Sequence, residues 1–213
     1  MKPPYENFEK IPAEEQERIL QACVAEFARN GYRQASTNTI VREAGIPKGT
    51  LFYFFGSKKD LFLYVVEHAI RRYAERHAGL AGEMPADLFE RLLHLGRTRF
   101  QFAAEEPELF RLLYNAFIQA PEEIQAALRE RAGGYAAASA EMLTAGLDRS
   151  RFREGVSVEQ AIALIQLTLD GLLNKYLGEL KEMSPEEALA LVERITEECR
   201  GYFELIRLGI YTK

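Results

Sequence analysis

Apolar residues recur at intervals of three and four along almost the whole chain, which is the spacing of one face of an α-helix. No segment has the alternation of apolar and polar residues that a half-buried β-strand requires. The periodic segments predict helices at about residues 12–29, 36–45, 47–55, 58–77, 85–105, 107–119, 121–146, 157–180 and 185–209. The pattern therefore predicts an all-α protein.

The ends of these segments carry residues that start or stop helices. Proline suits the first turn of a helix, where its missing N–H group costs nothing. It stands at the predicted starts Pro12, Pro47, Pro107, Pro121 and Pro185. Ser36 and Ser57 are suited to cap the second and fourth predicted helices. Gly31 and Gly45 are suited to end a helix, because glycine readily adopts the left-handed conformation found there.

Two short predicted helices flank a tight turn at Gly45-Ile46-Pro47. Each helix carries one apolar stripe, formed by Ile40, Val41 and Ala44 before the turn and by Leu51, Phe52 and Phe55 after it. This is the pattern of a helix-turn-helix, whose second helix is able to enter the major groove of DNA. We therefore expect a three-helix head at residues 1–60 and a larger helical body at residues 61–213, joined by the long fourth helix.

The distribution of charge supports a nucleic-acid partner for the head. The whole chain has a net charge of −5, which by itself argues against DNA binding. Residues 28–59, however, contain six basic side chains and a single acid, Glu43, which makes a local charge of +5. A basic segment around a DNA-reading helix attracts phosphate, and an acidic remainder limits non-specific binding.

Composition indicates a soluble cytoplasmic protein. Hydrophobic content of 47% and charged content of 28% are ordinary for a globular protein. No apolar run approaches the roughly 20 residues that span a bilayer, so we expect no membrane contact. Cys23 and Cys199 lie far apart on apolar stripes. We expect them to be reduced core residues rather than disulfide partners or metal ligands, and we expect no metal and no cofactor.

Motifs of catalysis are missing from the sequence. The chain contains no His-Glu-x-x-His, Cys-x-x-Cys, Gly-x-Ser-x-Gly or phosphate-binding Gly-Lys-Ser/Thr loop. The adjacent acids Glu122-Glu123 and Glu197-Glu198 are neighbours on helix surfaces, so the members of each pair do not face each other. We therefore do not expect an enzyme.

Two stretches of the head carry a resemblance to a known family. These are Phe-Ala-Arg-Asn-Gly-Tyr at 27–32 and Glu-Ala-Gly-Ile-Pro-Lys-Gly-Thr-Leu-Phe-Tyr-Phe-Phe-Gly-Ser-Lys-Lys-Asp-Leu-Phe at 43–62. They closely resemble the N-terminal domain of the TetR family of transcriptional regulators. The resemblance implies a homodimeric, sequence-specific DNA-binding regulator, usually a repressor. Its partners would be an inverted-repeat operator in double-stranded DNA and a small-molecule effector that releases the protein.

The expected DNA contacts lie around the second helix of the motif. They are Ser36, Thr37, Lys48, Gly49, Thr50, Tyr53 and Lys59. Lys48 is able to reach a base or a phosphate, and Gly49 lets the helix approach the duplex closely. Thr50 and Tyr53 share a helix face and offer hydroxyl groups, while Ser36, Thr37 and Lys59 would be positioning contacts to the phosphate backbone. Each of these side chains also has an ordinary structural interpretation, as a cap, a packing group or a solvated charge.

Three positions depart from the commonest pattern of the family, which reads Ser-Lys-Gly-Thr-Leu-Tyr-Tyr-His-Phe. Pro47 replaces the serine, Phe52 a tyrosine and Phe54 the histidine. Pro47 provides no hydroxyl for capping or for phosphate. Phe54 is restricted to an apolar contact with DNA, such as one with a sugar or a thymine methyl. The operator sequence therefore does not follow from the residues.

The body contains an aromatic-rich stretch with interleaved polar groups. In TetR-like proteins the corresponding helices enclose an effector pocket, so the candidate effector residues are His94, Arg97, Phe110, Tyr114 and Phe117. Aromatic residues at helical spacing are also ordinary core residues, and that alternative stays open. A body without a pocket would indicate a helix-turn-helix protein with no small-molecule ligand, either architectural or responsive to a protein.

The segment at 157–180 is apolar nearly all round, so it must bury two faces. With the last helix it is suited to form half of a four-helix interface with a second copy. The candidate interface residues are Ile165, Leu169, Leu172, Tyr202 and Leu205. The alternative is a helix buried within one protomer.

Overall fold

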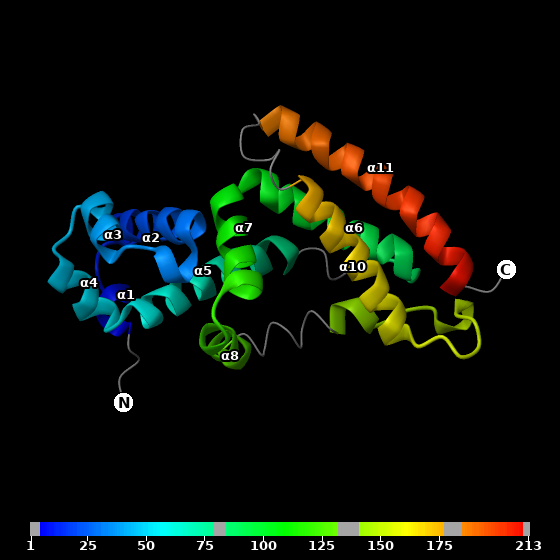
Figure 1. The fold of residues 1–213 in the computed structure, drawn as a ribbon, viewed down its shortest axis with the longest axis horizontal. Coiled ribbons are helices and arrows are strands. Elements are labelled where there is room, and N and C mark those ends of the chain that lie inside the picture. The colour runs from blue at the N-terminus through cyan, green and yellow to red at the C-terminus, as the bar shows by residue number, and fades with distance from the viewer. Residues whose placement is uncertain (1–4, 79–83, 132–140, 177–184, 211–213) are drawn as a thin grey trace. The chain divides into compact units, whose positions relative to one another are not determined.

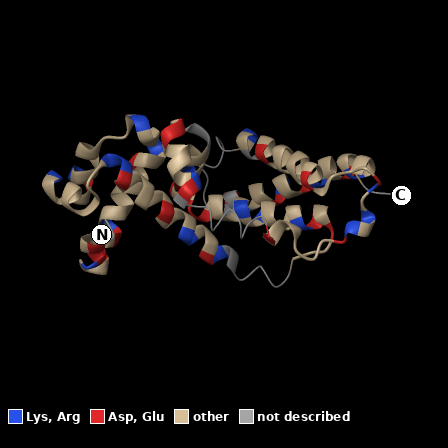
Figure 2. Ribbon diagram, turned by 90° about the horizontal axis from the view of Figure 1, so that it is seen from below, with Lys and Arg blue, Asp and Glu red and all other residues tan. Residues whose placement is uncertain are grey.

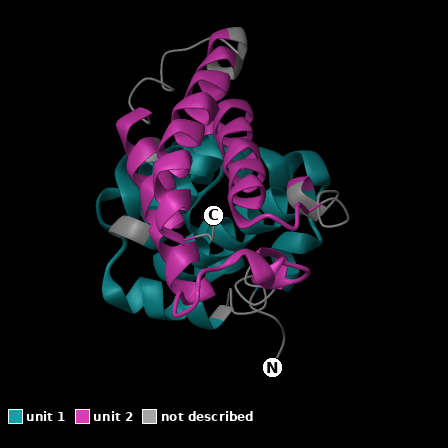
Figure 3. Cartoon of the chain, turned by 90° about the vertical axis from the view of Figure 1, so that its right-hand side faces the viewer, with its two compact units in different colours: residues 1–75, 108–134 teal, residues 76–107, 135–213 magenta. Residues whose placement is uncertain are grey.

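The computed structural model describes residues 5–78, 84–131, 141–176 and 185–210 of the chain (Figure 1). Within these ranges every regular element is a helix and no β-strand occurs, which confirms the all-α prediction. The chain divides into two compact units, each built from two stretches of sequence (Figure 3). Unit 1 comprises residues 1–75 and 108–134, and unit 2 comprises residues 76–107 and 135–213.

Unit 1 contains the head and three later elements. Its helices are α1 (Glu6–Glu9), α2 (Ala13–Gln34), α3 (Thr37–Ala44), α4 (Lys48–Phe55), most of α5 (Lys58–Ala78), nearly all of α7 (Pro107–Tyr114), the π-helix η1 (Asn115–Gln119) and α8 (Glu122–Arg131). α3 packs against α2 and α4, and η1 packs against α2 and α8. The compact unit thus extends beyond the head, whose expected boundary at residue 60 stays a prediction.

Unit 2 is built around α6 (Leu88–Glu105). α10 (Val158–Tyr176) and α11 (Pro185–Ile210) pack against α6 and against each other, and the short 3-10 helix η2 (Arg149–Arg151) precedes α10. The last residues of α5 also belong to this unit, so one continuous helix passes from unit 1 into unit 2. The expected helical body joined to the head by a long helix is therefore present.

Local capping chemistry sets most of the helix ends as predicted. Ser36 accepts a hydrogen bond from the Thr39 amide at 3.4 Å and caps α3. The Ser57 hydroxyl accepts one from the Asp60 amide at 3.1 Å at the start of α5. Pro47 precedes the first helical residue of α4 by one position. α2 continues five residues past its predicted end, through an interruption at Gly31, whose φ is 62°.

The later helices differ in extent from their predictions. The helix expected at 107–119 is α7 followed by one π-helical segment, η1. The helix expected at 121–146 begins as α8, and its middle lies outside the described residues. α10 is described as far as Tyr176, so the remainder of the helix expected at 157–180 also lies outside them.

The core of the head includes a short helix that the periodicity did not predict. α1 has only four residues, but its Phe8 is completely buried. The Phe8 ring lies 5.6 Å from that of Phe54 and 4.8 Å from that of Phe55, measured between centroids. Phe54 is only 6% exposed, so the suggestion that it contacts a sugar or a thymine methyl is wrong. Packing against Phe8 of α1 makes Phe54 a residue of the core.

The core of unit 2 contains a completely buried cation, Arg91 of α6. Its Nε donates to the Pro85 carbonyl at 2.7 Å. Its Nη1 lies within hydrogen-bond distance of the carbonyls of Met142, Leu143 and Ala145, at 3.2, 3.3 and 2.7 Å. A buried charge is tolerated only when it is well paired, and here carbonyl oxygens provide that pairing. Arg91 thereby holds residues 142–145 against the start of α6.

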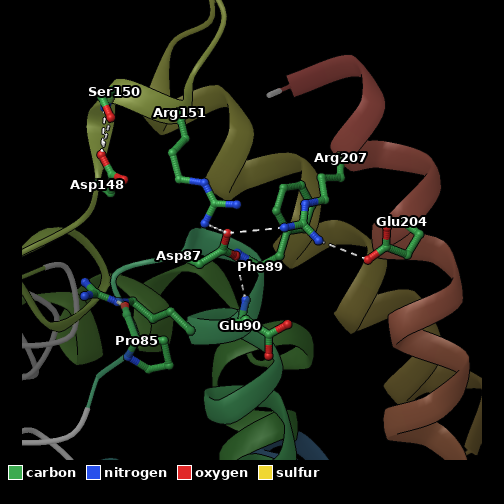
Figure 4. Close-up of polar contacts among 10 residues, drawn as sticks. Pro85, Asp87, Phe89, Glu90, Asp148, Ser150, Arg151, Glu204 and Arg207 are labelled. Atoms are coloured by element: carbon green, nitrogen blue, oxygen red, sulfur yellow. Dashed lines mark hydrogen bonds and ion pairs between the residues drawn. The ribbon is translucent and has the colours of Figure 1, made fainter. Parts of the chain in front are cut away.

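A polar cluster at the start of α6 joins three segments of unit 2 (Figure 4). Asp87 caps α6 by accepting hydrogen bonds from the Phe89 and Glu90 amides at 2.8 and 3.1 Å. The other oxygen of the same carboxylate forms ion pairs with Arg151 of η2 and, at 3.8 Å, with Arg207 of α11. One largely buried carboxylate thus connects α6, η2 and α11.

Candidate nucleic-acid interface

The turn between α3 and α4 has the geometry that a helix-turn-helix requires. Gly45 ends α3 with a φ of 64° and a ψ of 34°, a left-handed conformation that suits glycine. Its N–H group donates to the Arg42 carbonyl at 3.3 Å, and the Ile46 N–H group donates to the Val41 carbonyl at 3.1 Å. The turn therefore satisfies the last carbonyls of α3 and redirects the chain into α4.

A buried carboxylate positions the start of α3. Glu26 of α2 is only 6% exposed, and its Oε1 accepts a hydrogen bond from the Ser36 amide at 2.7 Å. A negative group at a helix N-terminus also interacts favourably with the helix dipole. Sequence reasoning missed this contact, because Glu26 and Ser36 lie ten positions apart and no short motif connects them. Glu26 thus fixes α3 on α2, and α3 in turn supports α4.

α4 presents one buried and one exposed face. Leu51 and Phe55 are each 1% exposed and contribute to the core of the head. Lys48, Gly49 and Tyr53 are exposed, and Tyr53 is 67% exposed although it is a large aromatic residue. A Cβ atom added to Gly49 would meet no atom within 4 Å, so the protein itself does not require glycine there. The residues expected to contact DNA on α4 therefore lie on its open face, with Thr50 half-buried beside them.

The expected backbone contacts lie at the starts of α3 and α5. Ser36 and Thr37 are half-buried, and Lys59 is exposed. The neighbouring Lys58 is held within the protein, because its Nζ donates to the Arg33 carbonyl at 3.1 Å and lies 5.2 Å from the centre of the Tyr32 ring. Burial lowers the pKa of Lys58, while the nearby Glu26 carboxylate opposes that shift. Figure 2 shows in blue the ribbon positions of the Lys and Arg residues that the structure describes.

The candidate effector residues divide between the two units. His94 and Arg97 are on α6 in unit 2, and Phe110, Tyr114 and Phe117 are on α7 and η1 in unit 1. The His94 Nε2 atom is buried and has no hydrogen-bond partner among the described residues. Phe110 is buried, Tyr114 is half-buried and Phe117 is 42% exposed. Their common role in binding an effector stays a prediction from the sequence.

The structure revises which face of α10 is open. Ile165, Leu169 and Leu172 are all buried within the protomer, so these three candidate interface residues are unavailable to a partner. The physical reason is packing against α6. A Cβ atom added to Gly96 of α6 would lie only 3.2 Å from a Leu169 methyl group. The exposed apolar residues are Leu164 and Leu167 on α10 and Tyr202, Leu205 and Leu208 on α11. Of the five candidates, Tyr202 and Leu205 are exposed.

The described residues contain no group of three or more His, Cys, Asp or Glu side chains placed to hold a metal ion. Cys23 and Cys199 are free and buried, and burial raises the pKa of the Cys23 thiol to about 12 and that of Cys199 to about 11. Both are therefore protonated and unreactive near neutral pH. Within residues 5–78, 84–131, 141–176 and 185–210, no helix has the length and hydropathy needed to cross a bilayer.

A family model for the bacterial regulatory proteins of the tetR family matches residues 19–65, which include the whole helix-turn-helix. The chain belongs to the TetR family. It is a DNA-binding transcriptional regulator, and the resemblance seen in the head sequence is confirmed.

Similar proteins extend the likeness beyond the head of this TetR-family regulator. The fatty acid metabolism regulator protein of Bacillus subtilis is 26% identical over 153 residues, which cover 72% of this chain and 78% of that protein. A TetR-family regulator from Chloroflexus aurantiacus has a similar fold, with a TM-score of 0.71, 24% identity and 98% of each chain covered. So does FadR of Bacillus subtilis, solved in complex with stearoyl-CoA, with a TM-score of 0.67, 23% identity, and 86% and 96% of the two chains covered.

Replacing Lys48 with alanine, or Tyr53 with phenylalanine, is expected to weaken operator binding without unfolding the head. Both side chains are exposed, so their loss costs little stability. If Lys48 contacts a phosphate, its removal should weaken binding to all sequences alike and lower the slope of log affinity against log salt by about one. Fluorescence anisotropy at several salt concentrations measures both quantities. Unchanged affinity in both variants would remove these side chains from the interface.

Proposed function

We propose that this TetR-family regulator is a repressor that binds an inverted-repeat operator as a homodimer and is released by a largely apolar, fatty-acyl effector. The observation that carries the DNA part is the open face of α4, where Lys48, Gly49 and Tyr53 are exposed on the second helix of a helix-turn-helix. A protein that binds an operator would act in the cytoplasm. Repression is the usual mode of the family.

Two kinds of observation support the fatty-acyl effector. Aromatic residues gather on α7 and η1, and the half-exposed Phe117 ring provides apolar surface for a ligand. The similar Bacillus subtilis protein is named for fatty acid metabolism, and the similar FadR structure holds stearoyl-CoA. The apolar surface of η1 and these two similar proteins together favour an acyl chain as the effector.

The exposed apolar residues of α10 and α11 support the homodimer. Tyr202, Leu205 and Leu208 follow each other at intervals of three on α11, and α10 packs beside it with Leu164 and Leu167 exposed. Several large exposed apolar side chains on two helices that pack together are typical of an interaction site. Pairing with a twofold-related copy would cover it, and two heads would then read half-sites about 34–36 Å apart.

Replacing Leu205 with alanine is expected to weaken the dimer severalfold. Leu205 is 71% exposed in the protomer, so the change removes apolar area from the proposed interface without opening a cavity in the core. Arg200→Ala is a matched control, because Arg200 is exposed on the same helix but off the apolar stripe. Analytical ultracentrifugation gives both dissociation constants. Equal constants in the two variants would argue against this interface.

The function is tested by DNA selection followed by effector titration. Purified protein should enrich an inverted repeat from a random duplex library, and two protomers should bind each site. Stearoyl-CoA, added to the labelled operator complex, should then raise the operator dissociation constant. An enriched repeat whose affinity does not respond to stearoyl-CoA would reject the fatty-acyl effector and favour a regulator without this class of ligand. Failure to enrich any sequence at low salt would count against the assigned reading face.

A further inference from the structure

α2 has a buried backbone carbonyl close to its interruption. Gly31 adopts φ 62° and ψ −177°, so the helical conformation is broken there. Ala28 lies three residues before Gly31, in the last turn before the break. Carbonyls of the last turn before a helix break generally lack their regular donors within the helix. Ala28 is only 3% exposed, and a buried carbonyl needs a hydrogen-bond partner. The partner must therefore come from outside α2 or from its last turn.

Asn115 supplies a hydrogen bond to this carbonyl. Its Nδ2 donates to the Ala28 oxygen at 2.9 Å, across 87 positions of sequence. Asn115 is the first residue of η1, and η1 packs against α2 within unit 1. A π-helix is rare, and most are single-turn irregularities within α-helices that are frequently found at functional sites. The amide of Asn115 thus attaches an irregular element of the later sequence directly to the helix that supports α3.

The residues next to Asn115 are those expected to meet an effector. Tyr114 ends α7 and is half-buried, and Phe117 lies two positions after Asn115 in η1 and is 42% exposed. Ala116 between them is completely buried, so η1 is anchored on one side and open on the other. A ligand that moves Phe117 would therefore act on η1, and Asn115 is part of the same five-residue element.

We propose that Asn115 is a positioning residue that couples η1 to the DNA-reading head through the Ala28 carbonyl. A shift of η1 would move or release this hydrogen bond, and with it the part of α2 from which Glu26 fixes the start of α3. This coupling provides a route from the effector residues to α4 that does not pass along α5. The link from the effector to this hydrogen bond rests on the proposed function. Coupling free energy is reciprocal, so operator binding must in turn alter η1.

The first experiment uses operator DNA alone and needs no effector. Hydrogen exchange of the full-length protein is measured by mass spectrometry with and without its selected operator duplex. In the natural protein, operator binding should change the exchange rates of residues 110–119 at least threefold. Asn115→Ala and the isosteric Asn115→Asp, which lacks the donor, should lose most of this change. An unchanged segment in the natural protein, or an equal change in the Asn115 variants, would overturn the proposal.

A matched control separates coupling from a general loss of hydrogen bonding. Gln125 also donates from its side-chain amide to a backbone carbonyl of unit 1, that of Ala120 at 2.9 Å, but this bond does not reach α2. Gln125→Ala should therefore keep the operator-dependent change at residues 110–119. Circular dichroism verifies that each variant is folded. A control that loses the change as completely as Asn115→Ala would show that the readout reports stability rather than coupling, and would also count against the proposal.

The second experiment measures coupling to stearoyl-CoA, with direct binding of the ligand recorded in parallel. The factor by which stearoyl-CoA raises the operator dissociation constant should fall at least threefold in Asn115→Ala, while the variant still binds the ligand. An undiminished factor would overturn the role of Asn115. If the natural protein itself does not respond, the fatty-acyl part of the proposed function fails, and the exchange experiment still decides the coupling.

Discussion

Replacing Gly49 with alanine is expected to leave the free protein at least as stable and to weaken operator binding roughly tenfold or more. Gly49 is exposed in α4, and an added Cβ meets no atom within 4 Å, so the folded chain has room for the methyl group. Alanine is favoured over glycine inside a helix by up to about 1 kcal/mol. If α4 lies against the duplex at this position, the same methyl group is forced into a close contact, which typically costs about 1–3 kcal/mol.

The opposite signs of the two effects make this substitution informative. Thermal unfolding measures the stability of the free protein, and anisotropy titration of the selected operator measures the affinity. Gln21→Ala serves as a control at an exposed position of α2, away from the reading face of α4, and should leave operator affinity unchanged. Gly49→Ser, which adds a larger group, should weaken binding further. A Gly49→Ala protein that binds its operator normally would show that α4 does not approach DNA at this residue.

Replacing Arg91 with methionine is expected to destabilise unit 2 by about 3 kcal/mol or more. The guanidinium group is completely buried and bonds to backbone carbonyls of Pro85, Met142, Leu143 and Ala145. Methionine fills part of the volume but donates no hydrogen bond. Hydrogen bonds to a charged group contribute about 1.5–3 kcal/mol each, so the loss of several of them is expected to be large.

Urea denaturation measures this loss, and Arg97→Met provides the matched control. Arg97 lies on the same helix but is exposed, so the same change should alter stability by less than about 0.5 kcal/mol. Because the chain has two compact units, the two halves of the transition are best followed separately by hydrogen exchange. Residues of α6 should lose protection first, while α3 and α4 keep theirs. Equal stabilities of the two variants would mean that solvent replaces the carbonyl contacts of Arg91 at no cost.

The sequence was most informative where structure depends on neighbouring residues. The caps at Ser36 and Ser57 and the left-handed Gly45 are local devices, so their positions could be read directly from the chain. The division of α4 into a core face with Leu51 and Phe55 and an open face followed from helical spacing alone. These local signals were sufficient to predict the helix-turn-helix and the exposed face of α4, while its contact with DNA stays a prediction.

The sequence was least informative where an element has no polar face or gains its contacts from a distant segment. α10 is apolar nearly all round, so periodicity did not distinguish the buried Ile165 and Leu169 from the exposed Leu164 and Leu167. Phe54 stands at a position where the commonest family pattern has a polar residue, and only packing against Phe8 of a four-residue helix showed that it is buried.

By itself, the sequence determined the helical class, the helix-turn-helix and the exposed face of α4, because these depend on spacing and on caps within a few residues. Only the tertiary structure decided which leucines are exposed on α10, how Glu26 holds α3, and that Asn115 reaches the Ala28 carbonyl. The physical reason is that burial and long-range hydrogen bonds are properties of packed elements. Ala28 and Asn115 lie 87 positions apart, so no short sequence pattern contains both and predicts their hydrogen bond.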